Sequence, residues 1–263
     1  MKRREKKRTH SQVYVSVLLA LLALVAVTAA TVAWFSIADR TKVRSMSLDI
    51  VTDVDLRMDL DPHETIDQYV KTLSFEAIAQ RIQSEKGFSM ADTPLQPVTT
   101  SDMRTFTFEN GTVAESASGA YLEFTLHFMA EKDMLVHLTS ANSSAQAQDG
   151  TEISSGVPSL PESMRISFTA DGQTWIYDPG MGNTAASSGS IKTFGLPGAS
   201  QMELTDANAM FSMAAGQDKE VVVHIWLEGT DPACTDELKS ADYAIRMRFT
   251  GTDISGASFE ETY

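Results

Sequence analysis

An unbroken apolar run from Val13 to Phe35 constrains this chain more than any other stretch. The run has 23 residues and no charge, and a helix needs about 20 such residues to cross the hydrocarbon core of a membrane. The sequence therefore predicts that residues 13–35 enter a membrane, at least transiently. The preceding residues, MKRREKKRTHSQ, include six Lys or Arg and one Glu. Since the basic flank of such a segment stays in the cytoplasm, we expect everything after Phe35 to reach the far side.

The charge of the chain separates the leader from the rest. The whole chain carries 21 basic and 35 acidic residues, and without residues 1–33 the remainder has 15 basic and 34 acidic residues. Such an acidic chain repels other polyanions, and nucleic-acid binding requires a basic surface, so nucleic acid is excluded as a partner. Cys234 is the one cysteine, so an intramolecular disulfide is impossible and a hydrophobic core must stabilise the exported part.

The leader has two interpretations. Its apolar run is longer than the roughly 7–15 residues of an ordinary secretory signal peptide, which favours an uncleaved signal anchor. Small residues late in the run, among them Ala29, Ala30 and Ala33, are typical of a cleavage site and favour a cleaved signal peptide. We expect residues 1–35 to be a signal peptide or signal anchor, and residues 36–263 to form one extracellular domain.

The end of the leader resembles that of a known group of exported proteins. Thr31, Ala33, Trp34 and Phe35 are followed by a short polar spacer and then by a predicted strand that includes residues 47–49. This boundary is similar to that of Gram-positive proteins exported through the SipW-type signal peptidase. These proteins include the TasA biofilm fibre protein and its camelysin relatives.

The resemblance implies that a SipW-type signal peptidase cleaves the chain near Ala30 or Ala33. It also implies a β-rich product at the cell surface or in a biofilm matrix, and self-assembly into a fibre of the TasA type is one possibility for such a product. A second segment, VHIWLEGTDPACTDEL at residues 223–238, looks like a recurrent segment of uncharacterised exported proteins from clostridia. That likeness implies a lineage but no activity.

Apolar residues alternate with polar ones from Met46 to Leu60, which predicts one long strand or two strands joined by a bend. Several of the polar positions are Asp, and two interpretations are a solvated strand face and a calcium site. The stretch DVDLRMDLD lacks the Gly that calcium loops use for their turn, which favours the solvated face. Residues 62–86 change to helical spacing, which predicts a helical insertion that starts at Pro62, as one helix or as two broken near Leu73–Ser74.

Further strands are predicted along the rest of the chain. They fall at residues 105–108, in two strands over 121–140, in a hairpin over 164–177 around Asp171-Gly172, at 219–229, and at 241–251. We expect strand 219–229 to be central because its apolar run is continuous, and we expect strand 241–251 to pair with it. The sequence predicts a mainly β fold, an antiparallel two-layer sandwich with a small helical insertion, preceded by the hydrophobic N-terminal helix. The resemblance adds the jelly-roll-like label.

No catalytic signature is found, so we expect no enzyme, no cofactor and no metal. His63-Glu64 lacks the second His of a zinc-protease helix. His127 and His137 are predicted to face solvent on their strands. Four acidic residues surround Cys234 in the sequence and suggest either a cation site or solvated turn residues: Glu228, Asp231, Asp236 and Glu237.

Three hypotheses for function follow from these patterns. The first is a structural protein of the cell surface or extracellular matrix, in which residues 36–60 complete the sheet of a neighbouring copy. The second is a membrane-anchored extracellular binding module for a glycan or protein, with Trp175 and Trp226 as stacking candidates unless they pack in the core. The third is a hydrolase that uses paired carboxylates, whose separation the sequence does not give.

Overall fold

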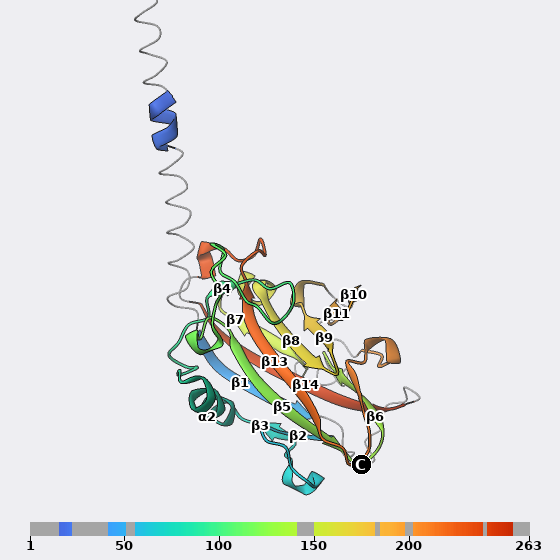
Figure 1. Ribbon diagram of the computed structural model, residues 1–263. Coiled ribbons are helices and arrows are strands. Elements are labelled where there is room, and N and C mark those ends of the chain that lie inside the picture. Colours follow the sequence, from blue (N-terminus) through green and yellow to red (C-terminus); the bar gives the residue numbers. More distant parts are fainter. Residues whose placement is uncertain are drawn as a thin grey trace, which may run out of the picture.

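The protein has a mainly β fold with two mixed sheets (Figure 1). This computed structural model describes residues 16–22, 42–50, 56–140, 150–181, 185–197, 202–238 and 241–254. Residues 16–22 are helical and exposed, and no helix of the described residues is long and apolar enough to cross a membrane. The rest of the apolar run 13–35 lies outside the described residues, so its membrane role stays a prediction.

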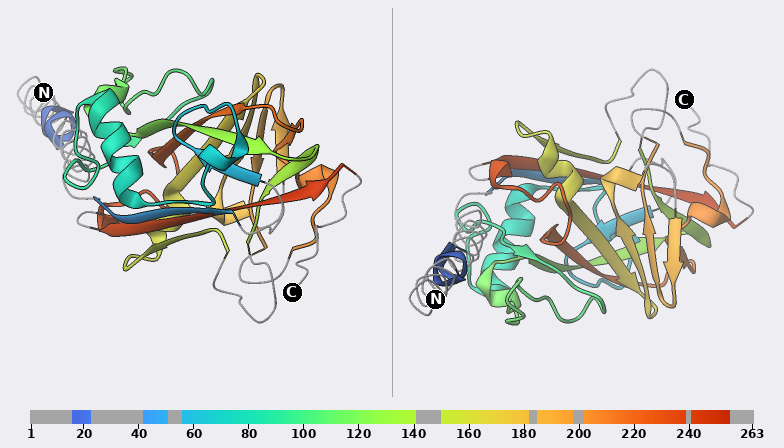
Figure 2. Two further views of the ribbon diagram at one scale, coloured as in Figure 1. Left: turned by 90° about the horizontal axis from the view of Figure 1, so that it is seen from below. Right: turned by 90° about the horizontal axis from the view of Figure 1, so that it is seen from above.

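The first sheet joins the two ends of the described domain. Its strands, in spatial order, are β12 (Phe211–Met213), β6 (Met134–Leu138), β14 (Asp242–Asp253), β1 (Lys42–Ile50) and β3 (Thr72–Leu73), and β7 (Glu152–Ser155) also pairs with β14. Figure 2 shows β1 and β14, in blue and red, running side by side. Strands almost 200 residues apart in sequence are thus neighbours in this sheet.

The second sheet contains most of the middle of the chain. Its strands, in spatial order, are β10 (Ala185–Ser188), β11 (Ile191–Phe194), β9 (Gln173–Tyr177), β8 (Met164–Ala170), β13 (Lys219–Glu228), β5 (Leu122–Ala130) and β2 (Leu56–Asp59), and β4 (Pro97–Val98) pairs with β13. The hairpin of β8 and β9 around Asp171-Gly172 and the central position of β13 are both confirmed.

Side chains of the two sheets meet in one hydrophobic core. Phe249 of β14 lies edge-on to Phe128 of β5 and to Phe168 of β8, with ring centroids 5.2 and 5.7 Å apart. Trp175 of β9 contacts Phe211 of β12 in the same way, at 6.2 Å. Such edge-to-face contacts are a preferred geometry for aromatic pairs, so they fix how the two sheets face each other.

The alternating pattern from Met46 to Leu60 is confirmed as two strands, β1 and β2, which belong to different sheets. The apolar residues of this pattern are buried in both strands: Met46, Leu48, Ile50, Leu56, Met58 and Leu60. Residues 51–55 lie outside the described residues. Each strand therefore presents one side to the core, as a period of two requires.

The helical insertion is shorter than predicted. Helix α2 spans Phe75–Lys86 and begins after Ser74, whose Oγ accepts a hydrogen bond from the backbone N–H of Ala77 at 3.3 Å. It ends at Gly87, where φ is +83°, a conformation that glycine adopts without strain. The predicted break near Leu73–Ser74 is confirmed, but the start at Pro62 is wrong, because the residues before the break form only the short 3-10 helix η1 (Ile66–Gln68) and the strand β3.

The remaining helical elements are short. They are η1 (Ile66–Gln68), η2 (Ser116–Ser118), α3 (Ser159–Ser163), η3 (Pro179–Met181), η4 (Asp206–Asn208) and η5 (Asp236–Leu238). The predicted strand at residues 105–108 is reduced to isolated bridges of Thr107 with Thr99 and Val113.

Two expectations about strand pairing are wrong. Strand β14 does not pair with β13 but lies in the other sheet, next to β1, β6 and β7. The sheets are not purely antiparallel, because β1 with β14, β4 with β13 and β9 with β11 are parallel pairs. Alternation along a strand shows which of its sides is buried, but it contains no information about the neighbour or its direction.

Candidate functional site

The residues predicted for signal processing, Ala30 and Ala33, lie outside the described residues. Cleavage of the leader therefore stays a prediction, and the functional candidates of the described chain lie in the domain that follows it.

The tryptophans proposed for stacking on a ligand are core residues. Trp175 and Trp226 are 8% and 2% exposed. The indole N–H of Trp226 donates to Glu228 Oε2 at 3.0 Å, and its ring lies edge-on to Phe106, with the centroids 5.5 Å apart. Because neither ring is available to a ligand, the alternative of core packing is confirmed for both.

The prediction that His127 and His137 face solvent is wrong, because both are buried. His127 Nδ1 contacts a carboxylate oxygen of Asp218 at 2.8 Å. The ring nitrogens of His137 contact Asn208 Oδ1 at 3.0 Å and Thr252 Oγ1 at 2.8 Å. Burial lowers the pKa of His137, since the charged form loses its hydration. Polar neighbours in the sequence gave no sign that other segments cover these strand faces.

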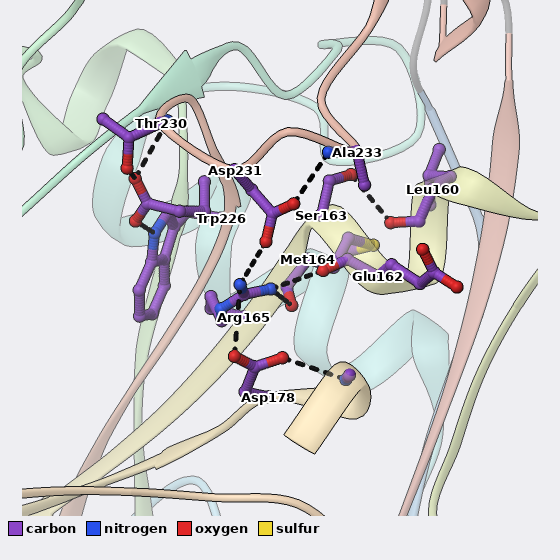
Figure 3. Close-up of polar contacts among 12 residues, drawn as sticks. Leu160, Glu162, Ser163, Met164, Arg165, Asp178, Trp226, Thr230, Asp231 and Ala233 are labelled. Atoms are coloured by element: carbon purple, nitrogen blue, oxygen red, sulfur yellow. Dashed lines mark hydrogen bonds and ion pairs between the residues drawn. The ribbon is translucent and has the colours of Figure 1, made fainter. Parts of the chain in front are cut away.

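Arg165 of β8 is the centre of a mostly buried ion cluster (Figure 3). Its guanidinium contacts Asp178 Oδ2 at 3.2 Å and also the carboxylate of Asp231. Its Nη1 donates to the carbonyl oxygens of Glu162 and Met164 at 2.6 and 2.9 Å. The side chains of Arg165, Asp178 and Asp231 are only 12%, 14% and 17% exposed. The cluster therefore ties the residue after β9 and the loop after β13 to β8.

Two of the four acidic residues around Cys234, Glu228 and Asp231, have hydrogen-bond partners within the protein. Asp231 Oδ1 accepts from the backbone N–H of Ala233 at 2.8 Å and so caps the turn, and Glu228 Oε1 accepts from the hydroxyl of Thr230 at 2.6 Å. Among the described residues, no three His, Cys, Asp or Glu gather as metal ligands would. Burial raises the pKa of Cys234 to about 12, so the thiol is protonated at neutral pH and is a weak nucleophile.

A polar row crosses three neighbouring strands of the second sheet. His224 of β13 lies opposite Glu123 of β5 on one side and Ser167 of β8 on the other. His224 Nε2 contacts Glu123 Oε2 at 3.2 Å, and Nδ1 lies 3.5 Å from Ser167 Oγ. Lys86, at the end of α2, donates to the other oxygen of Glu123 at 2.5 Å. The hydrogen bond from His224, with that from Lys86, lowers the pKa of Glu123 to about 2.

Serine, histidine and carboxylate are the residue types of a hydrolase triad, but in this row the serine and the histidine are buried and only Glu123 is partly exposed. Ser167 is fully buried, and its contact with His224 is at the outer limit of a hydrogen bond. The rings of Phe106 and Tyr121 lie 5.2 and 6.0 Å from the ring of His224, so they cover the histidine. The arrangement joins α2, β5 and β13. It was invisible in the sequence because strand register creates it.

We expect Glu123→Gln to lower the free energy of unfolding by about 1–3 kcal/mol at pH 7, because it removes a charge-assisted pair. The pKa of Glu123 is below its ordinary value in the folded protein, so the carboxylate stabilises the fold above about pH 4.5. This stabilisation is lost as the pH falls through about 2. Urea unfolding between pH 7 and pH 2 should therefore show a flatter acid dependence for the variant. Glu109→Gln, in an exposed turn, is the control; equal curves for both variants would contradict the prediction.

The strand that follows the leader, β1, has the geometry of an added strand. It pairs in parallel with β14 from Lys42↔Asp242 to Ile50↔Phe249, with an irregularity between Val43 and Ser45. On its other edge, the described strand partner is β3, which pairs with β1 at two positions. β1 thus lies near the margin of its sheet, and its main strand partner is the last strand of the described chain.

Buried side chains, rather than charge, hold β1 in place. Its inward residues are buried: Val43, Met46, Leu48 and Ile50. Arg44 contacts Asp242 at 2.6 Å, but the Arg44 side chain is 74% exposed, so this ion pair contributes little. The buried side chains therefore contribute most of the side-chain energy that holds β1 to the sheet. A β1 strand from another copy, paired in the same register, would bury the same side chains.

The protein thus has a mainly β fold with two mixed sheets, in which β1 pairs in parallel with β14, the last strand of the described chain. A scan against protein-family models, a search of curated proteins and a search of solved structures found no match.

Proposed function

We propose that this protein is an exported structural protein of the cell surface or extracellular matrix, a two-layer, jelly-roll-like sandwich that assembles by strand exchange. One observation carries the proposal. The strand directly after the leader, β1, is a marginal strand that pairs in parallel with the final strand, β14. Membership of the group exported through the SipW-type signal peptidase is part of the same proposal, on the resemblance of the leader.

Exchange of β1 between two copies conserves the contacts of this strand. When β1 leaves its own β14 and β1 of a second copy takes its place, the same backbone pairs form and the same side chains are buried. Since each copy offers one β1 and accepts one, contacts between successive copies are head-to-tail, and they close into a ring or continue as a fibre. Strand addition of this kind takes its affinity from main-chain hydrogen bonds and its specificity from alternate side chains.

Cleavage of the leader decides whether β1 has a free end. In a chain retained as a membrane anchor, the segment before β1 stays tied to the bilayer, which favours the alternative of a membrane-anchored binding module. That alternative has lost its stacking candidates, because Trp175 and Trp226 are buried. The structural protein is therefore the better supported proposal.

The test is the N-terminal sequence of the mature protein from membrane, wall and medium fractions. We expect a start near Thr31 or Trp34, recovered from wall or medium, when the full chain is produced in a Gram-positive host with a SipW-type signal peptidase. The matched variant replaces both Ala30 and Ala33 with leucine, and it should stay uncut. An intact N-terminus confined to the membrane for the unaltered chain would overturn the proposal in favour of the anchored module.

A further inference from the structure

The outer edge of β1 is covered by a strap, residues 61–73, which connects β2 to α2 and contains η1 and β3 (Figure 1). β3 pairs with β1 at Leu48↔Leu73 and Asp49↔Thr72. The backbone N–H of Ile50 also donates to the carbonyl oxygen of Lys71 at 2.9 Å. β1 therefore lies between β14 on one side and the strap on the other, and it cannot leave the sheet sideways while the strap is in place.

The strap is anchored by two buried side chains, Tyr69 and Leu73, and Leu73 is 5% exposed. From residue 61 to residue 72, Tyr69 is the one buried residue, and it is 1% exposed. Backbone bonds between Met58 and Val70, both 2.9 Å, hold the same part of the strap to β2. Val70 itself is 39% exposed. A segment with so little buried apolar surface belongs to the low-stability end of a fold, where local opening needs far less free energy than global unfolding.

The side chain of Tyr69 ends in a polar socket. The hydroxyl of Tyr69 donates to Asp218 Oδ1 at 2.7 Å, and the other oxygen of Asp218 contacts His127 Nδ1 at 2.8 Å. The same hydroxyl accepts from the backbone N–H of His63 at 2.9 Å, and the ring of His63 lies edge-on to that of Tyr69. Asp218, in the segment before β13, thus links Tyr69 of the strap to His127 of β5.

We propose that the strap is a gate over the outer edge of β1, held shut by Tyr69 in its socket of Asp218 and His127, and that β1 leaves or enters its place only while the gate is open. The gate is a property of the single chain. Its role in admitting β1 of a second copy rests on the proposed function. Because the socket lies apart from β1, changes in Tyr69 alter access to the strand while the contacts between β1 and β14 stay the same.

The first experiment measures local opening by amide hydrogen exchange in the full chain. Tyr69→Ala should speed exchange at Ile50 and Val70 at least tenfold and leave Val223, in the centre of β13, unchanged. Tyr69→Phe keeps the ring and should give a smaller increase. Ile66→Ala, a half-exposed position of the strap, is the matched control. Unchanged exchange at Ile50 in Tyr69→Ala, or an equal increase at Val223, would overturn the gate.

The second experiment measures uptake of a labelled peptide with the sequence of residues 42–50. Tyr69→Ala should take up the peptide faster than the unaltered chain. A disulfide between Asp49→Cys and Thr72→Cys, made with Cys234→Ser, should lock the strap and abolish uptake until a reductant is added, because directly opposed positions in an antiparallel pair are close enough to bridge. Uptake through the locked strap would overturn the gate. An open strap with no uptake by any variant would leave the gate standing and remove the proposed exchange.

Discussion

Replacing Arg165 with alanine is expected to lower the free energy of unfolding by about 3–5 kcal/mol, because it leaves two mostly buried carboxylates without their cation. Asp178 and Asp231 both contact the Arg165 guanidinium, and its Nη1 also bonds to two backbone carbonyl oxygens. Arg165→Lys should recover part of the loss, since an ammonium keeps the charge but lacks the planar arrangement of donors. Urea unfolding at pH 7 measures both variants.

An ion pair of similar chemistry at the surface is the control for Arg165. Arg81 and Glu85 lie one turn apart on α2, with side chains 23% and 43% exposed. Glu85→Gln should change the free energy of unfolding by no more than about 0.5 kcal/mol. A loss for Arg165→Ala as small as that of the control would show that the cluster does not hold the loop after β13 to the sheet.

Removing β1 is the second change with a large expected effect. A chain that starts at residue 51 lacks the buried side chains of Val43, Met46, Leu48 and Ile50. Burial of each such side chain is worth about 1.5–3 kcal/mol, and the whole stability of a domain is only about 5–15 kcal/mol. We therefore expect the shortened chain to lose cooperative unfolding, while a chain that starts at Lys42 keeps it.

A synthetic peptide of residues 42–50 should restore cooperative unfolding to the shortened chain by pairing with β14. The same peptide with Leu48→Asp should fail, because it places a charge in the core, whereas Ser45→Ala, at an exposed position, should act like the original peptide. Thermal unfolding followed by circular dichroism, with and without each peptide, measures the effect. A shortened chain as stable as the longer one would refute the importance of β1.

The local features of the domain were predictable because each depends on a short stretch of sequence. Alternation from Met46 to Leu60 predicted which side chains are buried, Asp171-Gly172 predicted the hairpin, and the continuous apolar run at 219–229 predicted a central strand. The helical spacing over residues 62–86 predicted a helix there, with a possible break near Leu73–Ser74, and α2 begins directly after Ser74. These patterns act within one strand, turn or helix, so sequence contains them directly.

The candidate site was predicted less well, because its parts are far apart in the chain. The sequence suggested that the segment after the leader begins with an exchangeable strand, but it gave no partner for that strand. It placed His127 and His137 in solvent, where the structure buries both. It gave no sign of the socket of Tyr69 or of the row from Glu123 through His224, since each unites residues from segments more than 90 positions apart.

The sequence by itself determined the apolar run at residues 13–35, the acidic composition of the rest of the chain, the β-rich class and the buried apolar side of strands such as β1 and β2. Only the tertiary structure decided that β1 pairs in parallel with β14, that the strap covers its outer edge, and that Arg165 joins Asp178 to Asp231. The physical reason is that side chains alternate between the two faces of a strand, so the pattern of apolar residues within one strand indicates which face is buried. Pairing depends on the free energies of many alternative neighbours, which the packing of the whole chain selects.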